Sequence, residues 1–172
     1  MAMGSVDTGT ASSAMSSAAG KYLTFKLREE SYGLGILKVQ EIIGIMPVTR
    51  VPRTPVFTRG VINLRGKVIP VLDLRLKFGM EATADTERTC VVVVQVLRNG
   101  DPITMGLIVD EVSEVVNVPE DHIEPPPSLG ASVDTEFILG MGKLGDKVVM
   151  LLDVDKALTA EEVSAVSAAA SE

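Results

Sequence analysis

The stretch Gly60-Val-Ile-Asn-Leu-Arg-Gly-Lys-Val-Ile-Pro-Val-Leu-Asp73 occurs a second time, in modified form, as Gly140-Met-Gly-Lys-Leu-Gly-Asp-Lys-Val-Val-Met-Leu-Leu-Asp153. The two stretches align at an offset of 80 positions and share glycine, lysine and aspartate at fixed spacing. Chance similarity between β-rich segments would scatter the matches over apolar positions. The fixed spacing therefore indicates an internal repeat.

The residues ahead of this stretch repeat as well, at an offset of 73 positions. Gly33, Leu34, Val39, Glu41, Ile42, Ile43 and Pro52 fall on Gly106, Leu107, Val112, Glu114, Val115, Val116 and Pro125. Because the two offsets differ by seven, the second copy carries a seven-residue insertion after Pro125. We place this insertion within Ser128 to Glu136.

Both copies consist of short β-rich runs bounded by turn residues, which is typical of an all-β protein. Tight hairpin turns are predicted at Arg65-Gly66, Asn99-Gly100 and Gly145-Asp146. A further turn at Glu29 to Ser31 is expected to lead into a strand from Tyr32 to Val39. The continuous apolar run from Cys90 to Leu97 predicts a strand that is buried on both faces.

A single copy would form a small sheet with little core and two exposed edges. Closing each copy into a barrel removes the edges, and packing the two barrels together enlarges the core. Pro70 predicts an edge or bulge at its position, because proline cannot donate to a central ladder. The sequence thus predicts two small β-barrels with minor helices, one of them opened by the capping box Thr159-x-x-Glu162.

The ordered part is expected to begin at Lys21. Residues 1–20 are rich in alanine, serine, glycine and threonine, which predicts a disordered N-terminal tail. The tail lacks the basic start and apolar middle of a signal peptide. We therefore expect a tail at 1–20, a folded domain at 21–162 and a C-terminal helix end or tail at 163–172.

The composition narrows the classes of partner. The formal net charge is −7 and there is no run of lysine or arginine, which argues against nucleic acid or an anionic membrane as the main partner. No apolar stretch approaches the roughly 18 residues of a membrane span. The only cysteine is Cys90, so no disulfide can form within the chain, and its apolar surroundings predict an inert thiol. The expected compartment is the cytoplasm.

The sequence shows no constellation of catalytic or metal-binding residues, and we predict neither an enzyme nor a cofactor. His122 is the only histidine, and its setting reads as a solvated turn. Two of the carboxylates of Asp110, Glu111 and Glu114 could in principle form a catalytic pair. However, Asp110 and Glu111 are adjacent in a strand-like run and point to opposite faces. A solvated rim is the simpler interpretation.

The segment Gly140-Met-Gly142-Lys-Leu-Gly145 matches the dinucleotide-binding pattern G-x-G-x-x-G. That motif requires a helix directly after it, because the helix N-terminus binds the pyrophosphate. Here the β-rich run Lys147 to Leu152 follows instead. We therefore interpret the match as coincidental.

Two charged residues have mostly apolar neighbours in the sequence. Glu41 lies in Val39-Gln-Glu-Ile-Ile-Gly44, and Arg65 lies at the tip of a predicted hairpin whose geometry is served by Gly66. Both could be ordinary solvated charges. The alternative is a recognition role, which suits the fork geometry of arginine. The second copy has Gly145 where the first has Arg65, so the two copies differ at this position.

Longer stretches around these residues resemble the CheW family of chemotaxis coupling proteins. The resemblance rests on Tyr32 to Ile43, Thr54 to Leu74, Gly106-Leu-Ile-Val-Asp110 and Phe137-Ile-Leu-Gly140, and it covers about Lys21 to Glu162. It implies an all-β fold of two intertwined five-stranded barrels of the Src-homology-3-like type. It also implies an adaptor at receptor arrays beneath the inner membrane.

The resemblance implies two partners: the cytoplasmic tip of methyl-accepting chemotaxis receptors and the regulatory domain of the histidine kinase CheA. Carried over position by position, the receptor contacts are Val39, Glu41, Gly60, Asn63, Arg65, Gly66 and Val115. The kinase contacts are Ile36, Arg59 and Leu129. Relatives can carry an aromatic residue at the position of Leu129, and leucine lacks the ring stacking of an aromatic anchor.

Two alternatives remain open at this stage. A CheW-like scaffold could join receptor arrays without coupling a kinase. A small barrel could also bind a small molecule.

Overall fold

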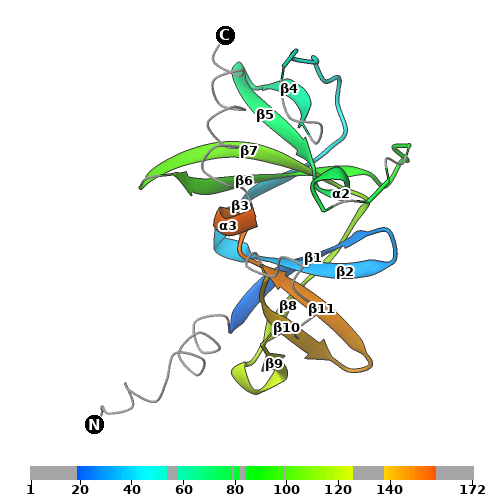
Figure 1. The fold of residues 1–172 in the computed structure, drawn as a ribbon, viewed down its shortest axis with the longest axis vertical. Helices are drawn as coiled ribbons and strands as arrows, with labels where there is room; N and C mark the ends of the chain where they lie inside the picture. Colours follow the sequence, from blue (N-terminus) through cyan, green and yellow to red (C-terminus); the bar gives the residue numbers. More distant parts are fainter. Residues whose placement is uncertain are drawn as a thin grey trace.

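The computed structural model describes residues 19–53, 58–78, 80–81, 84–98, 100–125 and 138–157. Within these ranges the chain is mostly strand, and the predicted all-β class with short helices is confirmed (Figure 1). The elements are β1 (Gly20–Leu27), β2 (Glu30–Gly35), the 3-10 helix η2 (Ile36–Lys38), β3 (Val39–Gly44), β4 (Thr58–Leu64), β5 (Lys67–Asp73), α2 (Leu74–Lys77), β6 (Cys90–Arg98), β7 (Asp101–Val109), β8 (Glu111–Val118), the 3-10 helix η3 (Glu120–His122), β9 (Ile123–Glu124), β10 (Ile138–Leu144), β11 (Lys147–Leu152) and α3 (Val154–Ala157). The capping box Thr159–Glu162, most of the predicted N-terminal tail and the predicted C-terminal segment lie outside the described residues.

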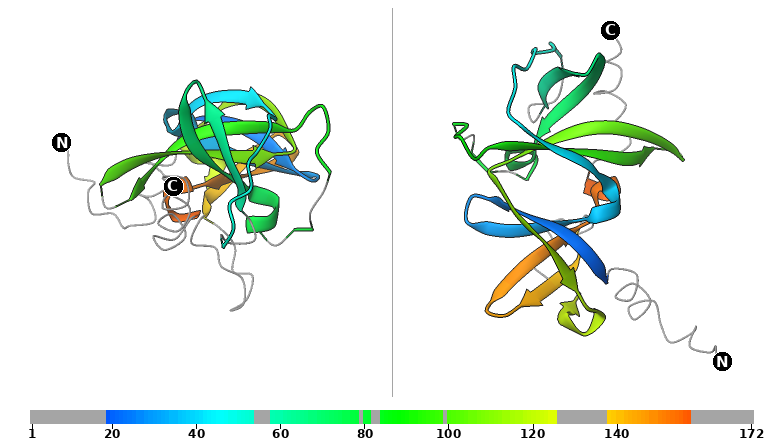
Figure 2. Two further views of the ribbon diagram at one scale, coloured as in Figure 1. Left: turned by 90° about the horizontal axis from the view of Figure 1, so that it is seen from above. Right: turned by 180° about the vertical axis from the view of Figure 1, so that it is seen from behind.

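The strands form two sheets that stack on one another (Figures 1 and 2). We call the six-stranded sheet, with the order β8-β1-β2-β11-β10-β9, sheet A. We call the five-stranded sheet, with the order β3-β6-β7-β5-β4, sheet B. Sheet B occupies the upper half of Figure 1 and sheet A the lower half.

Each sheet combines strands from both copies of the repeat. Sheet A takes β1 and β2 from the first copy and β8, β10 and β11 from the second, and sheet B takes the complementary set. Two parallel strand pairings join the two copies of the repeat. In one, Leu72 lies opposite Leu107, and in the other, Leu152 lies opposite Leu34. These pairs are equivalent under the repeat. The prediction that the barrels are intertwined is confirmed.

The simpler expectation, that each copy closes into its own barrel, is wrong. Only Asp110 separates the end of β7 at Val109 from the start of β8 at Glu111. If the second copy closed into its own barrel, β8 would pair with β6 on the side away from β7. It would then lie about 10 Å from β7. Two residue steps span at most about 7 Å. The chain must therefore pass into the other sheet.

The positions of the hairpin turns follow from the turn-forming residues in the sequence. Leu64 lies opposite Lys67, Arg98 opposite Asp101 and Leu144 opposite Lys147, so the three predicted hairpin turns are confirmed. The first turn lies earlier than expected, because Leu27 already pairs with Glu30. The strand predicted from Tyr32 to Val39 is interrupted by η2, which redirects the chain from sheet A to sheet B.

Pro70 lies inside β5, opposite Val61 of β4. The pairing of β5 with β7 begins only at Val71, opposite Gly106. On its β7 side, Pro70 therefore lies just outside the ladder, where a missing N–H costs nothing. The predicted edge position is therefore met only at Pro70 itself, because β5 as a whole lies between β7 and β4 in sheet B.

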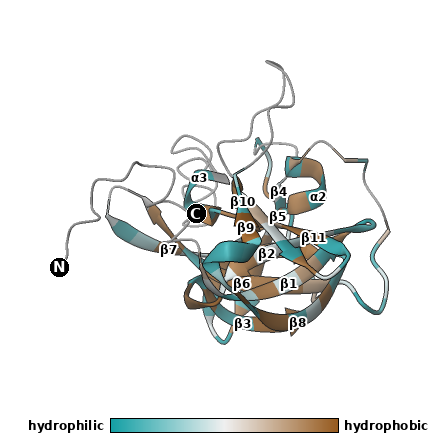
Figure 3. Cartoon of the chain, turned by 90° about the horizontal axis from the view of Figure 1, so that it is seen from below, coloured by the Kyte–Doolittle hydropathy of each residue, from teal (hydrophilic) through white to brown (hydrophobic). Residues whose placement is uncertain are grey.

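The hydrophobic core has three parts, and the largest lies between the sheets. It combines Leu23, Phe25 and Leu34 of sheet A with Leu72 and Leu107 of sheet B, together with further residues of both. Each of the two smaller clusters is built mainly from the strands of one sheet, the first from sheet A and the second from sheet B. Residues 91–94 of β6 have no exposed surface, which confirms burial on both faces for this half of the predicted strand, whereas Leu97 is 52% exposed. β6 is hydrophobic over most of its length (Figure 3).

Candidate interaction site

The tip of the hairpin between β4 and β5 has a well-defined geometry. Arg65 and Gly66 have φ angles of 53° and 85°, so both turn residues are left-handed, as type I′ hairpins require. The side-chain Oδ1 of Asn63 accepts a hydrogen bond of 2.8 Å from the N–H of Gly66. Gly66 and Asn63 thus have structural reasons to be present. Arg65 does not, because a left-handed conformation is uncommon for arginine.

The guanidinium of Arg65 reaches the carboxylate of Glu41 on β3. Nη1 donates to Oε1 at 3.1 Å, and Nη2 donates to Oε2. The hydrogen bonds from Arg65 hold the pKa of Glu41 below its ordinary value, and the pKa of Arg65 is raised in turn. The Arg65 side chain is 69% exposed, so the pair is presented to the surroundings.

The pair also joins the two ends of sheet B. β3 and β4 are the outermost strands of that sheet, yet Glu41 and the hairpin that follows β4 are in contact. Thr49, which follows β3, pairs with Val61 of β4 through two backbone hydrogen bonds of 2.9 Å. The sheet therefore closes into a barrel, and the Arg65–Glu41 pair lies on its closing seam.

A second set of charges, which sequence reasoning missed, surrounds Asp73 at the end of β5. Arg75 of α2 has no exposed side-chain surface, and its guanidinium donates to Asp73 at 2.9 Å and to Asp110 at 2.7 Å. Arg59 of β4 donates to Asp73 at 3.2 Å and to both carboxylate oxygens of Asp85 at 3.0 and 3.2 Å. We call these five residues the Asp73 cluster.

The electrostatics of the cluster follow from its burial and its pairing. Burial alone would raise the pKa of Asp73, but hydrogen bonds and charges from Arg75 and Arg59 outweigh this and lower it. A hydrogen bond from Arg59 is the main cause of the lowered pKa of Asp85. The hydrogen bond to Asp73 is the main cause of the raised pKa of Arg75. Asp73, Asp85, Arg59 and Arg75 are therefore ionised at neutral pH.

The expectation that Asp110 lies on a solvated rim is wrong. Besides accepting from Arg75, its carboxylate accepts a hydrogen bond from the backbone N–H of Arg28 in the turn between β1 and β2. A signal was present in the sequence. Arg75 lies between two leucines directly after Asp73, but its second partner, Asp110, lies in the connection between β7 and β8 and could not be inferred locally.

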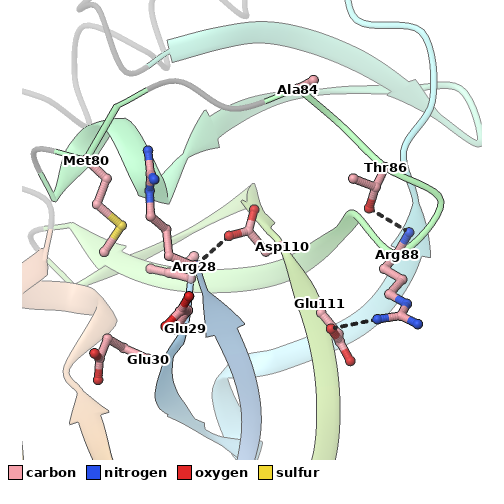
Figure 4. Close-up of a pocket in the computed structure, with 10 residues that line it drawn as sticks. Arg28, Glu29, Glu30, Met80, Ala84, Thr86, Arg88, Asp110 and Glu111 are labelled. Carbon is pink, nitrogen blue, oxygen red and sulfur yellow. Dashed lines mark hydrogen bonds and ion pairs between the residues drawn. The ribbon is translucent and has the colours of Figure 1, made fainter.

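A surface pocket of about 660 Å³ lies beside this contact (Figure 4). Leu27 and Met80 contribute apolar surface, while Glu29 and Glu30 contribute carboxylates. Arg88 on its rim forms a long ion pair of 3.7 Å with Glu111. In the described part of the chain, no group of three or more histidine, cysteine or acidic side chains is arranged to hold a metal ion.

The structure groups some of the predicted contacts and separates others. Val39, Glu41, Gly60, Asn63, Arg65 and Gly66 belong to β3, β4 and the following turn of sheet B, whereas Val115 lies on β8 of sheet A and is 50% exposed. Ile36 of η2 packs against the large core, and Arg59 is held in the Asp73 cluster. Leu129 lies outside the described residues.

Two further positions can be compared with expectation. His122 lies in η3 and is exposed, in agreement with the predicted solvated turn. Cys90, at the start of β6, is partly buried, and its thiol donates to the carbonyl of Arg88 at 3.2 Å. No helix in the described ranges is long and apolar enough to cross a membrane.

The two copies differ in charge at equivalent positions. Arg59, Arg65 and Arg75 of the first copy correspond to Leu139, Gly145 and Asp155 of the second. Asp155 accepts a hydrogen bond of 2.6 Å from Lys38 of η2, so the second copy has an ion pair of reversed polarity. The arginine of the β4–β5 hairpin thus has no counterpart in the equivalent β10–β11 hairpin of sheet A, although the β1–β2 hairpin of that sheet carries Arg28 with a φ of 59°.

Two strand-exchanged barrels with a shared core define a class of twin-barrel proteins. A solved structure described as the scaffolding protein TtCheW from Thermoanaerobacter tengcongensis has this fold, with a TM-score of 0.73 and 38% sequence identity. The match covers 84% of this chain and 90% of that chain. The family model for the CheW-like domain matches residues 21–162. The chain therefore belongs to the CheW family of chemotaxis adaptor and scaffold proteins.

Relatives from several bacteria agree. The chemotaxis protein CheW of Klebsiella aerogenes is 40% identical over 146 residues, covering 85% of this chain and 86% of that protein. The chemotaxis protein CheW of Helicobacter pylori is 36% identical over 138 residues, covering 80% and 81% respectively. A probable chemotaxis protein CheW of Rhizobium etli is 31% identical, covering 83% of this chain and 90% of that protein.

Proposed function

We propose that this chain couples methyl-accepting chemotaxis receptors to the histidine kinase CheA in signalling arrays on the cytoplasmic side of the inner membrane. Membership of the CheW family supports a role in chemotaxis. The observation that carries the coupling role is the exposed Arg65–Glu41 pair. It places an arginine in an uncommon backbone conformation at a hairpin tip, where folding alone does not call for one.

The receptor site centres on this pair in our proposal. An arginine fork and a neighbouring carboxylate can discriminate between partners by charge, because a mismatch at an interface is unfavourable. Ile42, the next residue of β3, adds exposed apolar surface on the other face of that strand and is 42% exposed. Val115 on β8 extends the receptor site to sheet A.

The kinase site comprises Ile36, Arg59 and Leu129 in our proposal. Arg59 is already bonded to Asp73 and to both oxygens of Asp85. A kinase carboxylate would therefore have to compete with Asp85 for the guanidinium. Arg59→Ala should weaken binding of the CheA regulatory domain while the receptor interaction persists, and circular dichroism would establish that the variant is folded.

The experiment that tests receptor coupling is Arg65→Glu in the full chain. Because the side chain is exposed, we expect normal folding. Co-sedimentation with receptor-containing membranes should weaken by roughly tenfold or more, and CheA binding should largely persist. Lys143→Glu, on the equivalent hairpin of sheet A, is the control, since Lys143 forms a comparable exposed pair with Glu124 at 2.6 Å.

The double exchange Arg65→Glu with Glu41→Arg should recover part of the binding if the pair itself is recognised. Normal receptor-dependent kinase activation in Arg65→Glu would refute the coupling role of Arg65. If receptors sediment with the wild-type chain but CheA never does, the chain is an array scaffold that does not couple a kinase.

A further inference from the structure

Glu114 on β8 occupies the same place in sheet A as Glu41 in sheet B. In sheet B the register shifts between Val39 and Glu41, and in sheet A it shifts between the equivalent strands around Glu114. Both glutamates therefore lie in the same β-bulge of two equivalent edge strands. Such bulges fix where a side chain is aimed.

The bulge in sheet A is held by a buried threonine. The Thr24 hydroxyl donates to the carbonyl of Glu114 at 2.7 Å and accepts from its N–H at 3.1 Å. This anchors the backbone of Glu114. Its side chain is exposed and forms no ion pair within the described part of the chain.

Arg65, the partner of Glu41, has no arginine counterpart at the equivalent position of the second copy. The position equivalent to Arg65 is Gly145, and a Cβ added there would meet nothing within 4 Å. By the equivalence of the two copies, Glu114 occupies the position that Glu41 occupies in sheet B, and position 145 has open space for the side chain that Arg65 supplies there. Beside it, Val115 exposes 50% of its surface.

We propose that Glu114 binds an arginine supplied by the partner, and that this partner is the cytoplasmic tip of the receptor. The inference rests on the proposed receptor site, whose residue Val115 follows Glu114 on β8, and specifies the chemistry that this part of the site selects: an arginine. The Arg65–Glu41 pair is the internal template for this contact, with two hydrogen bonds between the fork and the carboxylate.

The decisive variant is Gly145→Arg, which supplies the missing arginine within the chain. The φ angle of Gly145 is 63°, close to the 53° that Arg65 adopts, so the turn can accommodate an arginine. The new side chain should occupy Glu114 and weaken co-sedimentation with receptor-containing membranes about fivefold or more. Glu114→Gln should weaken it similarly.

Gly145→Gln is the matched control, because it carries the same backbone strain and a long side chain without the charge. It should bind receptors within about twofold of the wild type. Receptor binding that is unchanged in Gly145→Arg, or reduced equally in Gly145→Gln, would overturn the proposal. So would an effect on CheA binding or self-association alone, because the arginine would then come from another partner.

The variants distinguish a wrong receptor site from a wrong role for Glu114. If Arg65→Glu leaves receptor binding unchanged, the proposed receptor site itself is wrong. If Arg65→Glu weakens binding while Glu114→Gln and Gly145→Arg do not, only the role of Glu114 is lost.

Discussion

Arg75 and Asp110 lie 35 residues apart in the sequence, and their side chains meet at 2.7 Å. Arg75 belongs to the helix after β5 of sheet B, and Asp110 is the single residue through which the chain passes from sheet B to sheet A. Since Asp110 also accepts from the N–H of Arg28 in sheet A, this ion pair fastens the two sheets together.

Removing the Arg75 guanidinium should be strongly destabilising. Arg75→Met would leave Asp73 and Asp110 without their main partner, and breaking a buried ion pair costs about 3–5 kcal/mol. Urea denaturation at neutral pH measures this. Arg88→Met is the control and should cost less than about 1 kcal/mol, since Arg88 is 70% exposed. Equal losses in the two variants would contradict the structural role of Arg75.

The Asp73 cluster should also shape stability at acid pH. The pKa values of Asp73 and Asp85 are lowered in the folded chain, so their stabilisation is complete above the unfolded pKa of about 4 and is lost as the pH falls through the folded values. Asp85→Asn should therefore lower the urea midpoint at neutral pH and flatten its decline below about pH 4.

The control for the pH experiment is Asp121→Asn, in the exposed turn η3. Its urea midpoint at neutral pH should stay close to that of the wild type, because the Asp121 side chain is exposed. An Asp85→Asn curve that keeps the full wild-type decline would show that the ion pair with Arg59 does not form in solution.

Gly60 should not tolerate a side chain. Its φ angle is 145°, and an added Cβ would lie 2.1 Å from the carbonyl oxygen of Thr49, across the barrel closure. Gly60→Ala should therefore cost about 2–4 kcal/mol from backbone strain and overpacking. Gly35→Ala, where nothing lies within 4 Å, is the control for thermal unfolding. Comparable melting temperatures in the two variants would refute the close approach.

This result bears on the proposed receptor contact at Gly60. Because the absence of a side chain is required for barrel closure, loss of receptor binding in Gly60 variants would report damage to the fold. Variants of Arg65 and Glu114 are the better probes of recognition.

The shared core predicts a single unfolding transition. Leu72 and Leu152 are almost fully buried in the cluster between the sheets, so truncating either to alanine should cost about 2–5 kcal/mol. Calorimetry should show one transition at a lower temperature in both variants. Leu97→Ala, at a residue that is 52% exposed, should change little. Two separate transitions, one for each barrel, would show that the sheets unfold independently.

The sequence was sufficient to predict the strands and turns, because these depend on local chemistry such as the glycines of the hairpins. It could not decide which strands pair. Gly33-Leu34 and Gly106-Leu107 present nearly the same surface to a parallel neighbour, so the partner of Leu72 is set by chain length between strands. That is a three-dimensional constraint.

The candidate site was predictable to a similar degree. Glu41 and Arg65 could be singled out because neither is explained by strand or turn formation, and the structure brings them together. The Asp73 cluster was missed because Asp73 matches Asp153 in the repeat and so passed as part of the shared pattern. Its meaning depends on Asp110, which only the exchange of strands brings near.

The exchange of strands also sets an order of assembly as the chain leaves the ribosome. All five strands of sheet B lie between Val39 and Val109, whereas sheet A is assembled from β1 and β2 ahead of that segment and from strands that follow it. A nascent chain that has emerged as far as Asp110 contains every strand of one sheet and only a hairpin of the other. The first strands to be synthesised must therefore wait for β8 and β11, their neighbours in sheet A, before that sheet is complete.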